Sequence, residues 1–301
     1  MIIKQLIYLP WWFFRACILR KHMPLQTVLF ITDYCNLKCK HCTSSGHAGT
    51  VMKSYEQVKK ELEHEYKCGA RFVDFEGGEP MLWSDGERGI NDLVQLAKQV
   101  GFYSATVTTN GQLPLSGSKA DSIWVSVDGS GEVHDFIRGE GSFELLNKHI
   151  NESGHKDLSI NMTVNKLNRG VVGDVIEYAQ RNPAIKLISL NFHTPYPGVE
   201  DLQLPWDIRC EVIDEIIAFK KKGYRIMNSS SGLRVMKRRD FKKDCWLSSF
   251  VLADGVRLSE CPGKELKVCD SCGFCMAGET FCVLRLKPDT IFSALRLRVG
   301  L

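Results

Sequence analysis

Short apolar runs rich in β-branched residues alternate with longer helix-like stretches through the first two thirds of this 301-residue chain. Strands separated by helices are typical of βα units, whose strands pair in parallel within one sheet. Six strand-like runs follow this order, at about residues 27–31, 71–76, 104–108, 122–127, 158–164 and 186–192. The alternation therefore predicts an α/β fold, specifically a partial (β/α)6 barrel of the TIM type.

Two of the helix-like stretches carry clear boundary signals. Ser54 is a suitable N-cap for a helix predicted to extend to Cys68, and Gly69 is suited to end it. A second helix, predicted over 90–100, stops at Gly101. Both stretches place their apolar residues on one face, as helices that cover a sheet do.

Three cysteines, Cys35, Cys39 and Cys42, follow the first strand-like run in the order C-x3-C-x2-C. Three thiolates this close together can hold only one small inorganic group. Structural zinc sites usually take four protein ligands. The triplet therefore favours an iron–sulfur cube with one iron left open for a substrate or cofactor, and a zinc site or cysteines packed as small apolar residues are the alternatives.

Further motifs stand at the ends of the next three strand-like runs, where TIM barrels place their active sites. They are Gly77-Gly78-Glu79-Pro80, then Thr108-Thr109-Asn110-Gly111, then Ser126-Val127-Asp128-Gly129, which continues to Arg138-Gly139. Glycine has no Cβ atom, so the backbone at Gly77 and Gly78 can come close to a ligand. An arginine such as Arg138 suits a carboxylate, because its guanidinium can donate two parallel hydrogen bonds.

Taken together, these motifs resemble the radical S-adenosylmethionine (SAM) enzymes over most of residues 25–195. One departure is His41, which stands where the family usually has an aromatic residue before the last cysteine. The resemblance implies that Cys35, Cys39 and Cys42 hold a 4Fe-4S cluster whose open iron binds SAM. It also implies a set of SAM-binding residues: Gly77, Gly78, Glu79, Asn110, Ser126, Asp128 and Arg138.

The chemistry implied by this resemblance begins with one electron from the reduced cluster. The electron cleaves SAM to methionine and a 5′-deoxyadenosyl radical, which removes a hydrogen atom from a substrate or adds to it. The resemblance further implies a reductant such as flavodoxin or ferredoxin.

Six more cysteines lie near the end of the chain: Cys245, Cys261, Cys269, Cys272, Cys275 and Cys282. The Asp254-Gly255 dipeptide between the first two predicts a hairpin turn. This opening resembles the SPASM and twitch domains, which hold auxiliary 4Fe-4S clusters, but the later cysteine spacing departs from the SPASM pattern. Six cysteines are too few for two four-cysteine sites. We therefore expect one auxiliary cluster, with zinc as the alternative, because CxxC spacing serves zinc equally well.

The sequence suggests three regions: an aromatic and basic segment over 1–24, a core barrel over 25–225 and a cysteine-rich domain over 226–301. Twelve cysteines without a convincing export signal favour the reducing cytoplasm. The apolar stretch 6–14 is too short and interrupted to span a bilayer. It is expected either to lie in a membrane interface or to cover one end of the barrel.

Three functions from different classes remain open. The first is a radical SAM enzyme that modifies a peptide, a protein or another small molecule by hydrogen abstraction. The second is a radical SAM enzyme at the inner face of the membrane that modifies a lipid, for example by adenosyl addition. The N-terminal segment favours it, as do ten basic residues against one acid over 220–243. The third, a non-catalytic metal-binding scaffold, would not need the motif series. No clear signal for nucleic-acid binding is present.

Overall fold

The computed structural model describes residues 2–43 and 51–299. One sheet contains all of its named strands, in the order β6-β5-β4-β3-β2-β1-β7-β8. Six adjacent parallel strands form the predicted core: β1 (Gln26–Thr32), β2 (Phe72–Gly77), β3 (Ser104–Thr109), β4 (Ser122–Ser126), β5 (Leu158–Val164) and β6 (Ile188–Phe192). All six strand-like runs and the α/β class are confirmed.

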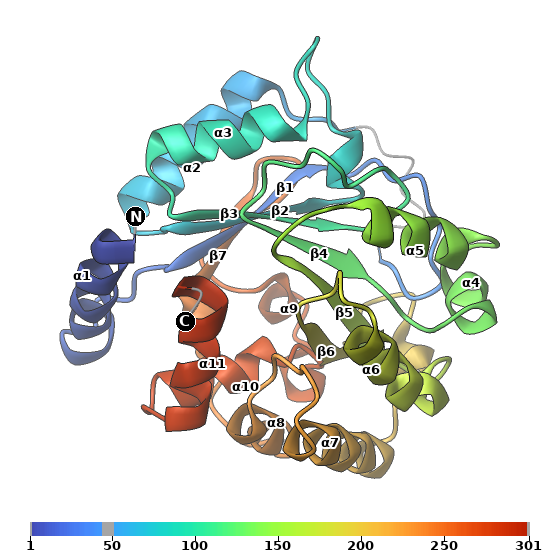
Figure 1. The fold of residues 1–301 in the computed structure, drawn as a ribbon. Helices are drawn as coiled ribbons and strands as arrows, with labels where there is room; N and C mark the ends of the chain where they lie inside the picture. The colour runs from blue at the N-terminus through green and yellow to red at the C-terminus, as the bar shows by residue number, and fades with distance from the viewer. Residues whose placement is uncertain (1, 44–50, 300–301) are drawn as a thin grey trace.

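Helices cover the outer face of this curved sheet (Figure 1). They are α2 (Tyr55–Cys68), α3 (Ile90–Val100), α4 (Glu132–Arg138), α5 (Ser142–Glu152), α6 (Val172–Arg181), α7 (Trp206–Lys221) and α8 (Ser230–Met236). The first two match the predicted helices. Ser54 Oγ accepts a hydrogen bond from the Gln57 backbone N–H at 3.2 Å, which confirms the N-cap. Gly69 and Gly101 end these helices with φ values of 120° and 117°, in the region that favours glycine.

The two faces of the sheet differ in polarity. Outward positions such as Leu29, Phe75 and Ile160 are fully buried against the helices and form the hydrophobic core. Inward positions are largely polar, and Asp74 and Asn161 are examples. Because side chains alternate along a strand, one sheet supplies both an apolar core and a polar barrel interior.

The cysteine-rich extension contacts both edges of the six-stranded core. Strand β7 (Ser248–Val251) pairs in parallel with β1, and β8 (Arg257–Leu258) returns antiparallel to β7, which confirms the predicted hairpin. At the other edge, the Phe192 N–H of β6 donates to the Gly273 carbonyl at 2.8 Å. The extension also contains α9 (Pro262–Glu265), α10 (Met276–Val283) and α11 (Pro288–Val299), and α10 packs against α8 (Figure 1). It therefore lies across the open side of the barrel.

The N-terminal helix α1 (Ile2–Phe13) continues into a π-helical turn, Phe14–Ile18. Tyr8 Oη donates to the Gly69 carbonyl at 2.5 Å, and Trp12 Nε1 donates to the Met23 carbonyl at 3.0 Å. One face of the segment is thus docked beside the start of β2. Within the described residues, no helix is both long enough and apolar enough to cross a membrane.

Candidate functional site

The cysteine triplet lies in the loop that leaves the C-terminal end of β1. Cys39 is buried, whereas Cys35 and Cys42 are half-buried. Burial raises the pKa of Cys39 to about 11, although the nearby Arg138 guanidinium opposes this shift. Burial also raises the pKa of Cys35. These two thiols are therefore protonated at neutral pH, and a metal that binds them must displace their protons.

The two glycines of the Gly77-Gly78 motif are packed against the chain itself. A Cβ atom on Gly77 would lie 2.1 Å from the Thr32 carbonyl oxygen, and one on Gly78 would lie 2.2 Å from that of Tyr34. The Gly78 N–H donates to the Thr32 carbonyl at 2.9 Å. The missing side chains thus bring this loop against the chain that leads into the cysteine loop. This close approach was not predicted, because the sequence suggested an approach to a ligand instead.

Glu79 joins the glycine loop to the Asn110 loop. Its carboxylate is fully buried and accepts hydrogen bonds from Thr109 Oγ1 at 2.7 Å and from the Asn110 N–H at 2.7 Å. It also accepts from the Met81 N–H at 2.9 Å. Burial raises the pKa of Glu79, and these donors oppose the shift. The carboxylate therefore positions two loops, and a direct contact between Glu79 and SAM stays a prediction.

Asn110 reaches the cysteine loop directly. Its Nδ2 donates to Asn36 Oδ1 at 2.8 Å and lies 3.7 Å from Cys35 Sγ. Sequence reasoning did not select Asn36. Its place directly after Cys35 is the only signal that could have indicated it.

A buried ion pair holds the third motif against the same loop. Arg138 Nε donates to Asp128 Oδ2 at 2.6 Å, and Arg138 Nη1 lies 3.9 Å from Cys39 Sγ. His41 Nε2 lies 3.5 Å from the same Asp128 oxygen. Burial alone would raise the pKa of Asp128, but Arg138 and His41 hold it below its usual value. The negative charge of Asp128 thus fixes two side chains at the cysteine loop.

Two more residues complete this region. Ser126 is the last residue of β4 and is partly buried, and its predicted contact with SAM stays a prediction. His134 was not selected from the sequence. It is fully buried and accepts a hydrogen bond from the Asp128 N–H at 3.2 Å through Nδ1. Burial lowers the pKa of His134 to about 4, with help from Arg138, so the ring is neutral.

The residues around the triplet fit a thiolate-bound cluster. Amide and guanidinium N–H groups of Asn110 and Arg138 lie beside the sulfur atoms of Cys35 and Cys39. Such donors stabilise the deprotonated, metal-bound form of a thiol. In addition, His41 Nδ1 is buried and has no hydrogen-bond partner among the described residues. The site thus offers soft sulfur ligands and polar groups that are suited to a bound cofactor.

A second group of thiols lines a cavity of about 190 Å³ in the C-terminal extension. Its cysteines are Cys245, Cys261, Cys269 and Cys272. Burial raises the pKa of Cys245 to about 12, and the other three thiols add to the shift. Within the described chain, no three His, Cys, Asp or Glu side chains are close enough to share a single metal ion.

The remaining two candidate cysteines do not line this cavity. Cys275 is buried, and its N–H donates to Asn191 Oδ1 of β6 at 2.9 Å. Cys282 is buried within α10. Four of the six candidate cysteines therefore line one cavity, and the other two are packed elsewhere.

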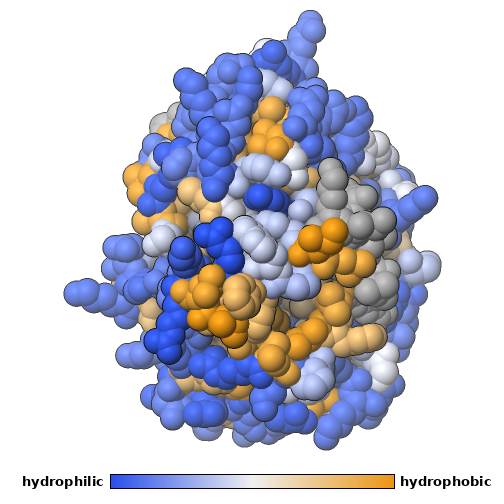
Figure 2. Space-filling view, turned by 90° about the vertical axis from the view of Figure 1, so that its left-hand side faces the viewer, coloured by the Kyte–Doolittle hydropathy of each residue, from blue (hydrophilic) through white to orange (hydrophobic). Residues whose placement is uncertain are grey.

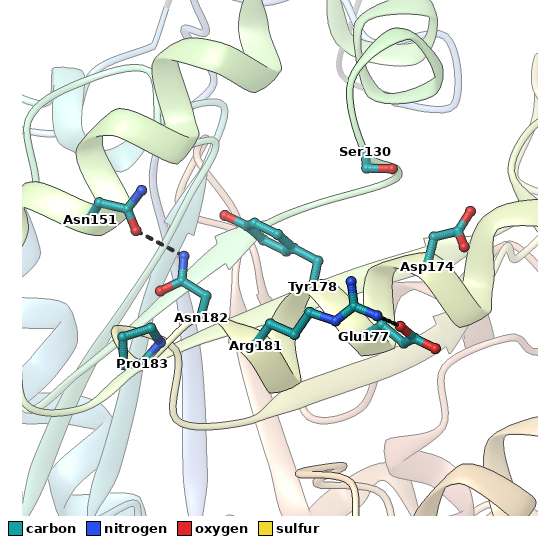
Figure 3. A pocket seen from close by; sticks show the side chains of 8 residues that line it. All are labelled: Ser130, Asn151, Asp174, Glu177, Tyr178, Arg181, Asn182 and Pro183. Atoms are coloured by element: carbon teal, nitrogen blue, oxygen red, sulfur yellow. Dashed lines mark hydrogen bonds and ion pairs between the residues drawn. The ribbon is translucent and has the colours of Figure 1, made fainter.

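Another hollow, larger than the cysteine-lined cavity, lies away from these groups. It has a volume of about 530 Å³ and lies beside α5 and α6 on the outside of the barrel (Figure 3). Arg181 and Glu177 form an ion pair there, and Asn182 donates to Asn151 at 2.9 Å. None of the motif residues lines it, so its size does not indicate the functional site.

Comparisons with known proteins agree with this geometry. The family model described as the Radical SAM superfamily matches residues 29–179, just over half of the chain. Mycofactocin maturase MftC of Mycolicibacterium smegmatis is 29% identical over 154 residues, which cover 48% of this chain and 39% of the relative. A probable GTP 3′,8-cyclase of Methanothermobacter marburgensis is 26% identical over 267 residues, covering 79% and 82% respectively. The chain thus spans about two fifths of the maturase.

A solved structure shares the fold. Streptococcus suis SuiB, in a crystal structure with the precursor peptide SuiA, aligns with a TM-score of 0.62 at 18% identity. The alignment covers 81% of this chain and 62% of SuiB. Radical SAM family members are enzymes that use a 4Fe-4S cluster and SAM. From the family match, together with the convergence of its motifs, we conclude that this chain belongs to the radical SAM superfamily.

Proposed function

We propose that this protein cleaves SAM reductively at a 4Fe-4S cluster on Cys35, Cys39 and Cys42 and uses the resulting radical to abstract hydrogen from a peptide. One observation carries the proposal. Three motif loops from different strands meet at the triplet, with Asn110 beside Cys35 and Arg138 beside Cys39. A scaffold without catalytic activity would not need this arrangement.

The chain's own residues have distinct parts in this proposal. When bound, the cluster and SAM supply one-electron chemistry that ends in a 5′-deoxyadenosyl radical. Asn110 and Arg138 direct N–H groups toward the thiolate sulfurs, and the backbone of Gly77 and Gly78 offers carbonyl groups to the SAM amino group. Glu79 keeps the loops in place, because its buried carboxylate bonds to both.

The substrate class is inferred from relatives. MftC is named a maturase, and SuiB was crystallised with a precursor peptide. The GTP 3′,8-cyclase relative covers more of this chain and has a nucleotide substrate. GTP is therefore the necessary control substrate. A flavodoxin or ferredoxin is the proposed electron donor.

The test is production of 5′-deoxyadenosine and methionine by the anaerobically reconstituted protein with dithionite. We expect both products, and none from the Cys35/Cys39/Cys42→Ala variant. Cys68→Ser, which changes an exposed cysteine of α2, is the matched control and should retain activity. If the triple variant cleaves SAM as fast as the unmodified protein, the proposal is wrong.

We also propose that Cys245, Cys261, Cys269 and Cys272 hold one auxiliary 4Fe-4S cluster. Four thiols line one cavity, and four thiolates complete the coordination of such a cube. Zinc would take the same ligands. Metal analysis of the reconstituted protein distinguishes these two metals.

A second candidate function, lipid modification at the membrane surface, is favoured by the exposed face of the N-terminal segment. Ile7 is 69% exposed and Ile18 is 62% exposed, and Trp11 and Phe14 are also exposed. No acidic residue precedes Asp33 in the sequence. On the side of the molecule that carries α1, hydrophobic groups lie beside strongly hydrophilic ones (Figure 2). Apolar side chains with basic neighbours suit an anionic lipid surface.

Flotation with vesicles that contain phosphatidylglycerol tests this second candidate. We expect binding at low salt and loss of binding in an Ile7→Ser/Ile18→Ser variant. These residues are exposed, so the fold should persist, whereas deletion of residues 1–21 would remove the docked Trp12. Phe292→Ser, at an exposed site on α11, is the matched control. Absence of binding by the unmodified protein would remove the support for this candidate.

A further inference from the structure

Tyr196 lies in the loop that follows β6, between Pro195 and Pro197. Proline fixes its own φ angle at about −65°, so this short segment has little conformational freedom. The loop is also tied to the cysteine-rich extension, because Thr194 Oγ1 accepts a hydrogen bond from the Gly273 N–H at 3.0 Å. The core barrel therefore presents Tyr196 to the extension from a fixed position.

The Tyr196 side chain borders the four-cysteine cavity and contacts one of its thiols. It lines this cavity together with Cys261, and its hydroxyl is hydrogen-bonded to the Cys261 sulfur. A Cβ atom placed on Gly263 would lie 3.5 Å from Tyr196 Oη and 3.6 Å from Cys261 Sγ, so these two atoms lie next to the same point. Cys272 and Cys269 also act on the hydroxyl electrostatically. The hydroxyl thus lies among three of the four thiols.

The direction of this hydrogen bond follows from the chemistry of the two groups. A tyrosine hydroxyl has an ordinary pKa of about 10, so it carries its proton at neutral pH. A metal-bound cysteine is a thiolate, which can only accept. The Gly263 N–H donates to the same sulfur at 3.4 Å. Cys261 therefore accepts from one hydroxyl of the core barrel and from one N–H of the extension.

Hydrogen bonds to the sulfur ligands of a cluster influence its reduction potential. Reduction adds one negative charge to the cluster and its thiolates, so a donor stabilises the reduced form more than the oxidised form. The potential is therefore higher with the donor than without it. The Tyr196 hydroxyl suits this role, because a donor held by a rigid loop does not have to reorient when the electron arrives.

We propose that Tyr196 raises the reduction potential of the auxiliary cluster through its hydrogen bond to the Cys261 sulfur. This inference rests on the proposed function, because it requires a 4Fe-4S cluster at the four-cysteine cavity. Tyr196 belongs to the core barrel, whereas all four cysteines belong to the extension. The loop after β6 thus controls how strongly the extension holds an electron.

The test compares the auxiliary potential of the reconstituted protein with that of a Tyr196→Phe variant. Phenylalanine keeps the ring and removes only the hydroxyl, so the fold should persist. Redox titration with dithionite, followed by electron paramagnetic resonance, measures each cluster separately. At a fixed potential, we expect the ratio of reduced to oxidised auxiliary cluster to fall about tenfold, which is a decrease of about 59 mV for a one-electron couple. The Cys35 cluster should keep its potential.

Tyr178→Phe is the matched control. Tyr178 Oη donates to Asn147 Oδ1 at 2.8 Å, between the outer helices α6 and α5. The control thus also removes one hydroxyl hydrogen bond, and it should leave both potentials unchanged. An equal decrease in both variants would overturn the inference, as would an unchanged or higher auxiliary potential in Tyr196→Phe.

Electron–nuclear double resonance in heavy water gives a second readout, which a loss of stability would not change. The hydroxyl hydrogen of Tyr196 exchanges with solvent, so the reduced auxiliary cluster should couple to one deuterium that the Tyr196→Phe variant lacks. The deuterium on the Gly263 nitrogen should remain in both proteins. Identical deuterium couplings in the two proteins would contradict the proposed contact.

SAM cleavage by the same samples separates this inference from the proposed activity. A protein with two reducible clusters, whose potentials are the same in Tyr196→Phe, refutes only the role of Tyr196. A protein that cleaves SAM with one reducible cluster refutes the auxiliary cluster and this inference, and it leaves the proposed activity established. A protein that shows the expected decrease in potential but does not cleave SAM refutes the activity alone.

Discussion

The two groups of thiols in this protein differ in the number of cysteines and in the charge around them. The Cys35 loop has three cysteines, and its nearest arginine, Arg138, is neutralised by Asp128. The C-terminal group has four cysteines around one cavity. Near it lies Arg209, which is only 3% exposed and has no carboxylate partner among the described residues. Three ligands leave a metal position for a second molecule, whereas four ligands close the site.

This difference suggests a division of roles. At the first site, hydrogen bonds that Glu79 accepts and the Asp128–Arg138 ion pair fix the loops around the thiols. Such positioning is required where a cofactor must be oriented for chemistry. At the second site, Lys243 and Lys264 line the cavity, and the buried Arg209 interacts with Cys272. We expect the first site to bind SAM and the second to hold a cluster without direct contact with SAM.

The largest expected effect is on metal content and SAM cleavage. The reconstituted protein should contain about eight irons per chain, four for each cube. The Cys35/Cys39/Cys42→Ala variant should keep about four and lose SAM cleavage. A Cys261→Ala/Cys272→Ala variant should also keep about four, but it should retain measurable cleavage. Iron, sulfide and zinc analysis checks these numbers.

The control for this comparison is a Cys275→Ala/Cys282→Ala variant, because neither thiol lines the four-cysteine cavity. It should keep the full iron content. Loss of about four irons from this variant would show that the group of four is assigned wrongly. Zinc in place of iron at the C-terminal group would establish the alternative metal.

The fold was predictable from the sequence, and so was the position of the cysteine triplet after the first strand, because both depend on short-range patterns. The six strand-like runs, the Ser54 cap and the cysteine spacing are each contained in a few neighbouring residues. The partners of Glu79 were not predictable, because Asn110 lies 31 residues away and is brought near only by the parallel pairing of β2 with β3.

The separation of the six C-terminal cysteines was also beyond the sequence. Cys272 and Cys275 are three residues apart, yet only Cys272 lines the cavity. Cys275 is held instead by Asn191, on a strand distant in sequence. The inward Asp74 and Glu76 did carry a signal, since polar residues alternate through several strand-like runs. That alternation indicates a polar barrel interior.

The second prediction concerns the charge pair at the first site. Arg138→Met would leave the fully buried carboxylate of Asp128 without its main cation. Loss of one partner from a buried ion pair costs about 3–5 kcal/mol, and urea unfolding of the reconstituted protein measures this loss. The matched control is Arg181→Met, which breaks an exposed pair and should have an effect close to zero. Equal stability of the two variants would contradict the proposed role of Asp128.

A third, smaller effect is expected from the buried His134. Its pKa of about 4 lies below the value of about 6.5 expected in the unfolded chain. The unfolded state therefore binds more protons between these values, and stability is lost as the pH falls from 6.5 toward 4. At pH 5 this effect should lower the free energy of unfolding by about 2 kcal/mol.

His134→Asn keeps an acceptor for the Asp128 N–H but cannot be protonated, so the urea midpoint of this variant should vary less with pH. An identical pH dependence in both proteins would exclude this role.

The smallest predicted effect is on the redox potential of the C-terminal site. Arg209 Nε and Nη1 have no hydrogen-bond partner within the described chain, and Cys275 and Cys272 are the thiols that interact most strongly with its charge. An unbalanced buried cation favours the more negative, reduced form of a nearby cluster. We therefore expect Arg209→Gln to lower the auxiliary potential by about 40–90 mV, which corresponds to about 1–2 kcal/mol. Arg209→Lys retains the charge and should change the potential less.

Redox titration followed by electron paramagnetic resonance measures both clusters in one sample. A shift at the Cys35 cluster alone, or none at either, would refute this assignment, because Arg209 lies with the C-terminal thiols.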